Sequence, residues 1–189
     1  PKDIYRRYCY LTQYLCLPRM TELLLVRHGE TEDNVRQIMQ GQTHGRLTAH
    51  GRQQAEALAQ QLSSKKIDVL VSSDLQRAID TAVIIGAPHH LPLVTTPLLR
   101  ERDWGGFTGR FIPDLKDEKW PDDVETMAQL MARSRDFIDF VLTHYAGCCV
   151  VAVGHGIINK AIQAVYHKKP IHEVPRMGNA EVRTLIFSH

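Results

Sequence analysis

The sequence has 189 residues, of which 43% are hydrophobic and 23% are charged, with 23 basic against 21 acidic side chains. This length suffices for one sizeable core and requires no second domain. The formal net charge of +2 excludes broad electrostatic binding to nucleic acid or to an anionic membrane surface, and no apolar run is long enough for a membrane span.

Residues 1–19 are expected to form a peripheral extension and residues 20–189 the functional domain, because Met20 directly precedes a strand-like run. Arg6 and Arg7 stand before a mildly apolar stretch, as in an export signal, but tyrosines interrupt it and no small-residue cleavage site follows. The four cysteines have neither CxxC spacing nor histidines placed to complete a zinc site. We therefore expect no metal site, no disulfide framework and a cytoplasmic location.

Strands and helices alternate in the first half of the domain. Unbroken apolar runs predict strands at Leu23–Val26 and Ile67–Val71, and Leu93–Thr95 is a weaker candidate. Thr48 can cap a helix between the first two strands. The apolar face of that helix would be Ala55, Leu58, Ala59 and Leu62. Ser73 and Gln76 form a capping-box pattern that predicts a second helix. Its apolar face would be Leu75, Ala78, Ile79, Ala82 and Val83.

The same alternation continues to the end of the chain. A long helical stripe is predicted from Val124, Met127, Met131, Ser134, Ile138 and Val141. A buried strand follows at Cys148–Val153, and then a helix with Ile158, Ala161, Ile162 and Val165 on its apolar face. Glu181–Phe187 alternates as a sheet-edge strand does. The fold class is therefore predicted to be α/β, a three-layer α/β/α sandwich around a mainly parallel sheet.

Polar residues that carry chemistry follow three of the predicted strands. They lie in Arg27–Gly29, Ser72–Arg77 and His155-Gly156. Because the carboxyl ends of parallel strands face one crevice, these segments are expected to meet at one ligand. Guanidinium groups match phosphate oxygens, and helix amino termini after Ser73 and His155 would add backbone N–H donors. The predicted occupant is a phosphate dianion.

Phosphoryl transfer at such a site needs a nucleophile and an acid. One neutral histidine can attack phosphorus, and the other, with the arginines, would neutralise the equatorial oxygens. The charged segment Arg100–Asp103 supplies candidate acids for the leaving group. Alone, Arg77 would be interpreted as a solvated surface charge that opposes the helix dipole, a conflict that a bound anion resolves. His155, between two glycines, is poorly explained as packing.

At these residues the sequence resembles the histidine phosphatase superfamily, which includes cofactor-dependent phosphoglycerate mutases, fructose-2,6-bisphosphatase domains and small bacterial phosphatases. The resemblance runs from Met20 through the last strand, and its motifs occur in the family's order. They are Leu25-Val26-Arg27-His28-Gly29-Glu30-Thr31 with Asn34, Gln40-Gly41, Leu47-Thr48 with Gly51 and Ala55, Ser72-Ser73-Asp74-Leu75 with Arg77-Ala78 and Thr81-Ala82, Leu99-Arg100-Glu101 with Gly105 and Gly109, and Gly154-His155-Gly156.

The resemblance implies a phosphoglycerate mutase-like fold and assigns roles to individual residues. His28 would be the nucleophile and Glu101 the proton donor, with Asp103 as the fallback acid. Arg27, Arg77 and His155 would complete the catalytic set. The residues in contact with the phosphate or nearby substrate would be Arg27, Asn34, Gln40, Gly41, Arg77, His155 and Gly156. No cofactor is expected, and Glu101 as a carboxylate would then activate water against the phosphohistidine.

Two departures from the family pattern bear on the substrate. His44 stands where many relatives carry an acid, and Trp104–Gly109 differs from the usual end of the acid loop; both are expected to edge the substrate pocket. The 46 residues from Arg102 to Gly147 (147 − 102 + 1) are a short insertion compared with the mutases, and a small cover retains an intermediate poorly against water. A phosphatase of small phosphorylated substrates is preferred. A mutase and a phosphate-dependent binding module without turnover remain alternatives, and the oligomeric state is open, a homodimer included.

Overall fold

The computed structural model describes residues 20–188, so the predicted extension 1–19 lies outside the described residues. Five strands form one sheet in the order β3-β2-β4-β1-β5, in which β5 alone runs antiparallel to its neighbour. The strands are β1 Met20–Arg27, β2 Val69–Ser73, β3 Leu93–Thr96, β4 Cys149–Gly154 and β5 Val182–Ser188. All five predicted strands are confirmed, with ends shifted by at most three residues.

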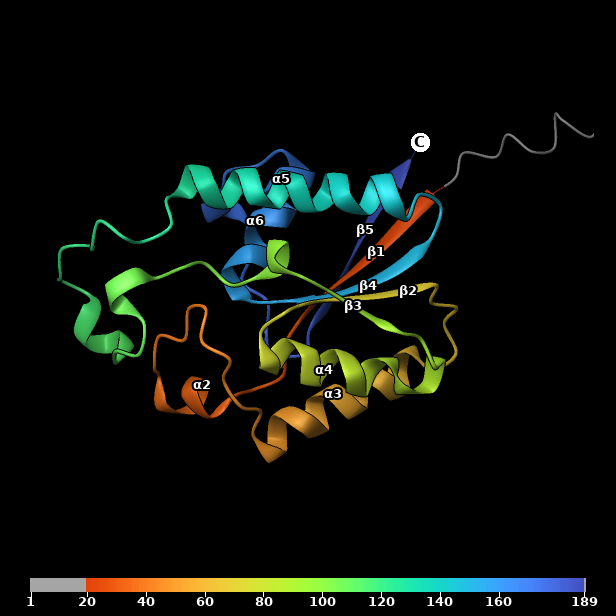
Figure 1. Ribbon diagram of the computed structural model, residues 1–189, viewed down its shortest axis with the longest axis horizontal. Coiled ribbons are helices and arrows are strands. Elements are labelled where there is room, and N and C mark those ends of the chain that lie inside the picture. Colours follow the sequence, from red (N-terminus) through yellow and green to blue (C-terminus); the bar gives the residue numbers. More distant parts are fainter. Residues whose placement is uncertain (1–19, 189) are drawn as a thin grey trace, which may run out of the picture.

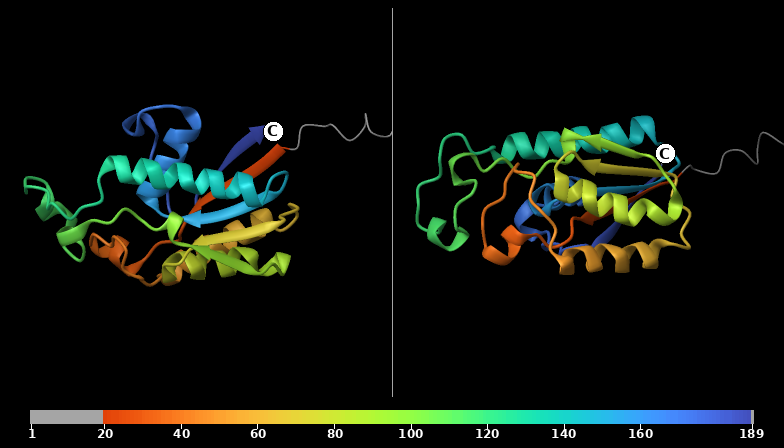
Figure 2. Two further views of the ribbon diagram at one scale, coloured as in Figure 1. Left: turned by 45° about the horizontal axis from the view of Figure 1, so that its top comes forward. Right: turned by 60° about the horizontal axis from the view of Figure 1, so that its bottom comes forward.

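Helices cover both faces of this sheet (Figures 1 and 2). The helices are α2 Glu32–Arg36, α3 Ala49–Leu62, α4 Gln76–Gly86, α5 Met127–His144 and α6 Gly156–His167. Helices α3 and α4 pack on one face, and α5 and α6 on the other (Figure 1). The predicted three-layer α/β/α sandwich is confirmed. Among residues 20–188, no helix has the length and apolarity that a membrane crossing demands.

Strand β1 shows why its apolar run is unbroken. Leu23 and Leu25 pack in the cluster under α5 and α6, whereas Leu24 and Val26 pack in the cluster under α3 and α4. Successive side chains of a strand point to opposite faces, so a strand buried on both sides needs apolar residues at every position. Each buried leucine contributes about 2 kcal/mol relative to an exposed one. The central strands therefore anchor the sheet edge on which the polar segments lie.

Helix α4 begins later than its capping-box pattern predicts. Ser73 still belongs to β2, and its Oγ accepts a hydrogen bond from the Leu75 N–H, while Leu75 occupies the N-cap without a side-chain cap. The predicted capping box is wrong because the strand extends to Ser73. Val83, predicted on the buried face, is 55% exposed, and Ile85 is buried instead.

Helix α5 also differs from prediction at its start. It begins at Met127, where Thr126 and Gln129 form a capping box. Val124 lies before the helix and packs in a separate small cluster with Phe107 and Leu115. Capping by Thr126 thus ends the irregular segment that precedes α5 and separates Val124 from the main core.

Residues 103–126, here called the cover segment, lie beyond the carboxyl ends of the parallel strands (Figure 1). Backbone hydrogen bonds join this segment to the loop after α2: Met39 N donates to Arg110 O at 2.8 Å, and Gly109 N donates to Met39 O at 2.7 Å. Since α5 belongs to the sandwich, only this part of the 46-residue insertion can cover a site. The loop after α2 and the cover segment therefore form one wall.

Candidate active site

The strand register brings the predicted polar segments together. Arg27 of β1 pairs with Gly154 of β4, and Ser72 of β2 pairs with Val153. The residues that follow these pairs emerge side by side at one sheet edge. Thr81 fixes two of the segments to each other, because its Oγ1 accepts from Gly29 N at 3.1 Å and donates to Arg77 O at 2.7 Å. The predicted convergence is confirmed.

The loop after β1 is held very close to α3. A Cβ atom on Gly29 would lie 2.4 Å from Gly51 O, and one on Gly51 would lie 2.1 Å from Glu30 O. Only glycine permits this approach of two backbones. The contact fixes the backbone on which the next candidate, His28, is carried.

His28 is 3% exposed and has a defined tautomer. Its Nδ1 lies 2.7 Å from Gly29 O, and a carbonyl can only accept, so Nδ1 carries the proton and Nε2 the lone pair. Arg77 Nε donates to Nε2 at 3.3 Å. Burial, followed by the charges of Arg77 and Arg27, holds the pKa of His28 well below its usual value. His28 is therefore a neutral imidazole with its lone pair toward the arginine.

His155 is fully buried, and its ring centroid lies 5.1 Å from that of His28. Both of its ring nitrogens lack a hydrogen-bond partner among the described residues. Burial, followed by the charge of Arg77, lowers its pKa well below the usual value. Buried polar atoms are normally hydrogen-bonded, so His155 is a group that a bound oxyanion could satisfy, although it does not line the open cavity described below.

These two histidines predict that the fold loses stability in mild acid. Their pKa values are lowered from 6.5. Below pH 6.5 these histidines therefore bind protons in the unfolded chain but stay neutral in the folded chain. The contribution of the neutral histidines to stability is complete above that pH and falls as the pH decreases, by at most about 2 kcal/mol per histidine at pH 5, the limit that the pKa in the unfolded chain sets. Urea unfolding at pH 7.5 and pH 5 measures this loss. His28→Asn should reduce the loss by roughly half, and an unchanged free energy of unfolding would contradict the burial of neutral imidazoles.

Arg77 is 1% exposed and organises the loop opposite His28. Its guanidinium donates to the carbonyl oxygens of Gly41 at 2.9 Å and His44 at 3.2 Å, and also to that of Thr43. Burial lowers its pKa to about 10, so it stays charged at neutral pH. The surface-charge interpretation of Arg77 is wrong, since these carbonyl dipoles offset both its burial and its place at a helix amino terminus.

His44 takes a different place from the one predicted. Its carbonyl oxygen accepts from Arg77 N at 3.1 Å, and its Nδ1 accepts from Gln76 N at 3.4 Å. The N–H groups of the first turn of α4 are therefore occupied, and the prediction that they bind phosphate is wrong. His44 lies at this helix start and does not line the cavity. Trp104, by contrast, does line it.

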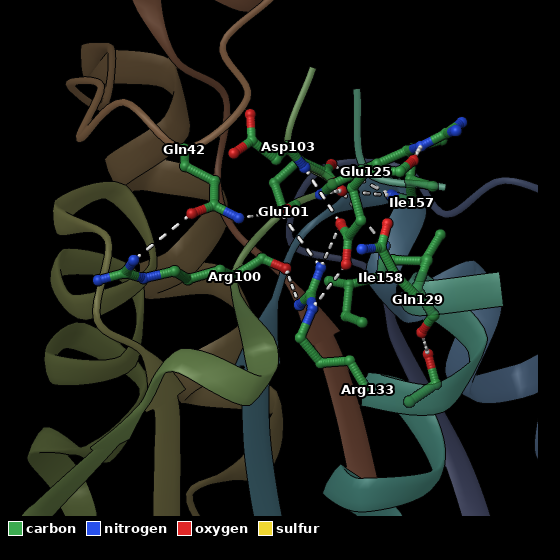
Figure 3. A network of polar contacts seen from close by, with 12 residues as sticks. Gln42, Arg100, Glu101, Asp103, Glu125, Gln129, Arg133, Ile157 and Ile158 are labelled. Atoms are coloured by element: carbon green, nitrogen blue, oxygen red, sulfur yellow. Dashed lines mark hydrogen bonds and ion pairs between the residues drawn. The ribbon is translucent and has the colours of Figure 1, made fainter. Parts of the chain in front are cut away.

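Glu101 is placed by the amino terminus of α6. Its carboxylate accepts from Ile157 N at 3.1 Å, from Ile158 N at 3.2 Å and from Arg102 N at 2.8 Å (Figure 3). The N–H groups of Ile157 and Ile158, part of the helix start predicted to bind phosphate, are occupied by Glu101, so the prediction is wrong for these two groups. Gly156 is not among the donors to Glu101 and lines the cavity, and its predicted contact with phosphate stays a prediction. Asp103, the fallback acid, is exposed, accepts from Gly105 N and lies outside the cavity wall. Glu101 is the carboxylate that faces the site.

Arg27 completes the positive side of the site. Its Nη1 donates to Met177 O at 2.7 Å, while its buried Nε has no hydrogen-bond partner among the described residues. Burial lowers its pKa, and the nearby Glu101 carboxylate acts in the opposite direction. A guanidinium nitrogen that is buried and unpartnered is suited to an oxyanion.

A cavity of about 350 Å³ opens over these groups. Its wall combines charged and polar side chains with apolar ones. The lining residues are Arg27, His28, Asn34, Ile38, Met39, Gln40, Gly41, Arg77, Glu101, Trp104, Ile112, Gly156, Ile157, Arg176 and Met177. Every predicted site residue except His155 thus lies in this wall. Across residues 20–188, no group of three or more His, Cys, Asp or Glu residues is arranged to hold a metal ion.

Asn34 has a defined amide orientation within this wall. It belongs to α2, a short helix that was not predicted, whose capping box joins Thr31 and Asn34. Asn34 Oδ1 accepts from Thr31 N and from Asn179 Nδ2, each at 3.2 Å. Because its oxygen already accepts two hydrogen bonds, the amide NH₂ group at Nδ2 is the donor that Asn34 can offer to an oxyanion. Asn179 also donates to His28 O at 3.1 Å.

The segment from Arg176 to Asn179 was not recognised from the sequence. It lies just before β5, whose antiparallel direction brings its amino end to the edge where the parallel strands end: Val182 pairs with Val26. The edge-like pattern of β5 was visible, but its direction was not. A prediction that β5 runs antiparallel to β1 would have placed Arg176, Met177 and Asn179 at the site.

The chain matches the family model of the Histidine phosphatase superfamily (branch 1) over residues 23–189. It belongs to the histidine phosphatase superfamily. The chain is 34% identical to a probable phosphoglycerate mutase GpmB of Yersinia enterocolitica over 84% of this chain and 80% of that protein. It is 32% identical to an uncharacterized phosphatase PhoE of Bacillus subtilis over 89% of this chain and 90% of that protein.

Solved structures give the same result for the fold. A native mycobacterial glucosyl-3-phosphoglycerate phosphatase superposes with a TM-score of 0.80 at 31% sequence identity, covering 89% of this histidine phosphatase and 91% of that chain. The phosphoglycerate mutase-like fold is therefore confirmed, and the relatives include both hydrolases and a mutase by name.

Proposed function

We propose that this histidine phosphatase hydrolyses small phosphomonoesters through a phosphohistidine on His28, with Glu101 as the proton donor. One observation carries the proposal: a neutral His28 faces a cavity that also presents Arg27, Arg77 and the Glu101 carboxylate. None of the six ion pairs among residues 20–188 involves either arginine. Their charges are available to a phosphate dianion.

In the first step, His28 Nε2 donates its lone pair to phosphorus and the bond from phosphorus to the alcohol oxygen breaks. Glu101 in its acid form gives its proton to that oxygen, because an alkoxide leaves poorly. Arg27 and Arg77 neutralise charge on the equatorial oxygens, and we assign His155 and the Asn34 amide to the same task. The alcohol then leaves the phosphoenzyme.

In the second step, a water oxygen attacks phosphorus and the bond from phosphorus to Nε2 breaks. Glu101 as a carboxylate takes one proton from that water, and inorganic phosphate leaves. The structure holds Glu101 in a hydrogen-bonding arrangement that suits this base form, since three backbone N–H groups donate to its oxygens. The free enzyme is regenerated with Glu101 protonated.

We further propose a substrate that carries a carboxylate beside its phosphate. Arg176 lines the cavity, is exposed and takes part in none of the six ion pairs of the described region. Trp104 and Ile112 contribute apolar surface to the same cavity. The names of the mutase and glucosyl-3-phosphoglycerate phosphatase relatives refer to phosphoglycerates, which contain such a carboxylate.

The free thiols of Cys148 and Cys149 suit the reducing cytoplasm in which we place the enzyme.

A mutase is the second candidate, because a named relative is a probable phosphoglycerate mutase. The same inner site could return the phosphoryl group to a second hydroxyl. That outcome requires the intermediate to be kept from water. We prefer hydrolysis because the cover is limited to residues 103–126.

The test uses 3-phosphoglycerate and glycerol 3-phosphate, two three-carbon esters that differ in one carboxylate, with a metal chelator present. We expect inorganic phosphate from both, with kcat/KM about two- to fivefold higher for the carboxylate ester, as one exposed ion pair can supply. Arg176→Met should reduce that preference, whereas Arg52→Met, an exposed arginine outside the cavity, should not.

Other outcomes separate the alternatives. Formation of 2-phosphoglycerate without phosphate release would favour the mutase. Loss of activity in chelator would overturn the metal-independent mechanism. A folded enzyme that binds phosphate but turns over neither ester would favour a binding module.

A further inference from the structure

A cluster of charged side chains lies beside residues 98–103, here called the acid loop, and outside the cavity. It joins Arg133 of α5 to Glu125 at the end of the cover segment (Figure 3). Arg133 Nη2 lies 2.7 Å from Glu125 Oε2, and Arg133 Nε lies 3.0 Å from Glu125 Oε1. The two side chains are 17% and 12% exposed. This two-point, largely buried pair is more rigid than a surface ion pair.

The remaining donors of Arg133 hold the main chain on the amino-terminal side of Glu101. Its Nη1 donates to Leu98 O at 3.0 Å and to Arg100 O at 2.6 Å, and its Nη2 donates to Glu101 O at 3.4 Å. One guanidinium thus binds three carbonyl groups in four consecutive residues. The planar group fixes the path of this segment.

Glu125 holds the main chain on the other side of Glu101. Its carboxylate accepts from Asp103 N at 3.1 Å, and its carbonyl oxygen accepts from Arg102 Nε at 2.8 Å. Its own N–H donates to Asp103 O at 2.9 Å. The pair of Arg133 and Glu125 therefore forms hydrogen bonds with the main chain immediately before and after the proposed proton donor, Glu101.

We infer that Arg133, oriented by Glu125, is a positioning residue that sets the location of the Glu101 carboxylate for proton transfer. Neither side chain lines the cavity, so neither touches the substrate. The inference rests on the proposed function of Glu101. Proton transfer requires the donor within hydrogen-bond distance of the leaving oxygen, and a small misplacement is costly. Hydrogen bonds that involve a side chain join His28 to Gly29, Arg77 and Asn179 and not to residues 98–103, so we expect its attack on phosphorus to be less sensitive to this loop.

This separation gives the inference a specific signature. An ester with a poor leaving group needs the proton, whereas an activated ester does not. Loosening the acid loop should therefore slow phenyl phosphate much more than 2,4-dinitrophenyl phosphate. A general loss of structure would slow both esters equally.

The experiment compares kcat/KM for these two esters in the wild type, Glu101→Gln, Arg133→Lys and Glu125→Gln. For Arg133→Lys, which keeps the charge but loses the planar fork, we expect a loss of about tenfold or more with phenyl phosphate and less than about threefold with the dinitrophenyl ester. Glu125→Gln, which keeps its size and backbone contacts, should show a smaller loss with the same pattern. Arg133→Gln/Glu125→Gln, which leaves no lone buried charge, replaces Arg133→Lys if that variant does not fold.

A second ion pair of the cover segment provides the matched control. Arg110 and Glu118 form a two-point pair at the surface that does not contact residues 98–103. Arg110→Gln should change the ratio of the two rates by less than about twofold. An equal loss on both esters in the Arg133 and Glu125 variants would overturn the positioning role. If Glu101→Gln itself lacks the leaving-group signature, the assignment of Glu101 fails first.

Discussion

Replacing His28 with alanine is expected to lower kcat by about 10⁴-fold or more for every phosphate ester. In the proposed mechanism the imidazole forms the bond to phosphorus, and loss of that nucleophile would remove the covalent route completely. The two arginines remain, so the variant should still bind inorganic phosphate or vanadate. Stopped-flow or steady-state phosphate release measures the loss, and ligand-induced quenching of tryptophan fluorescence can report binding, because Trp104 lines the cavity.

The covalent step can be observed directly. With ³²P-labelled ester and an alkaline quench, which preserves a phosphorus–nitrogen bond, the wild type should carry label on protein and His28→Ala should carry none. Glu101→Gln should retain more label if water activation is slowed. His50→Ala, which changes an exposed histidine outside the cavity, is the control. Label and turnover that persist in His28→Ala would refute the phosphohistidine mechanism.

The fold and the inner site were largely accessible from the sequence for related reasons. Strands buried on both faces must be continuously apolar, so β1 and β4 were recognisable, and the abrupt change to Arg27-His28 and to His155 then marked the ends of those strands. Parallel strands bring such ends together without any knowledge of loop conformation. The identities of His28, Arg77 and Glu101 followed from that geometry together with the family resemblance.

Contacts that depend on the conformation of loops could not be predicted from the sequence. The hydrogen bonds from Arg133 to residues 98–101 join segments that are about thirty positions apart, and no periodic pattern in the sequence indicates them. The N–H groups of α4 and α6 were predicted to bind phosphate because helix amino termini generally bind anions. In this chain His44 and Glu101 occupy them. The general preference of helix amino termini for electron-rich partners could not say whether a ligand or a side chain of the protein fills them.

The second large effect is expected for Arg77→Met. This change removes a buried cation that can neutralise an equatorial oxygen, and kcat/KM at pH 8 should fall by about 10²- to 10³-fold. It also removes the charge that, after burial, most strongly lowers the pKa of His28. The pKa of His28 should therefore rise, and more of the nucleophile will be protonated in mild acid. The loss should consequently be greater at pH 6 than at pH 8, which a pH profile of kcat/KM measures.

Arg77→Lys separates the two roles of this side chain. An ammonium retains the positive charge near His28, so the acid limb of the pH profile should stay close to that of the wild type. It cannot reproduce the guanidinium contacts with Gly41 and His44, so kcat/KM should still fall at every pH. If the acid limb moves equally in Arg77→Lys and Arg77→Met, the guanidinium contacts of Arg77 with the loop, and not its positive charge, set its effect on the ionisation of His28.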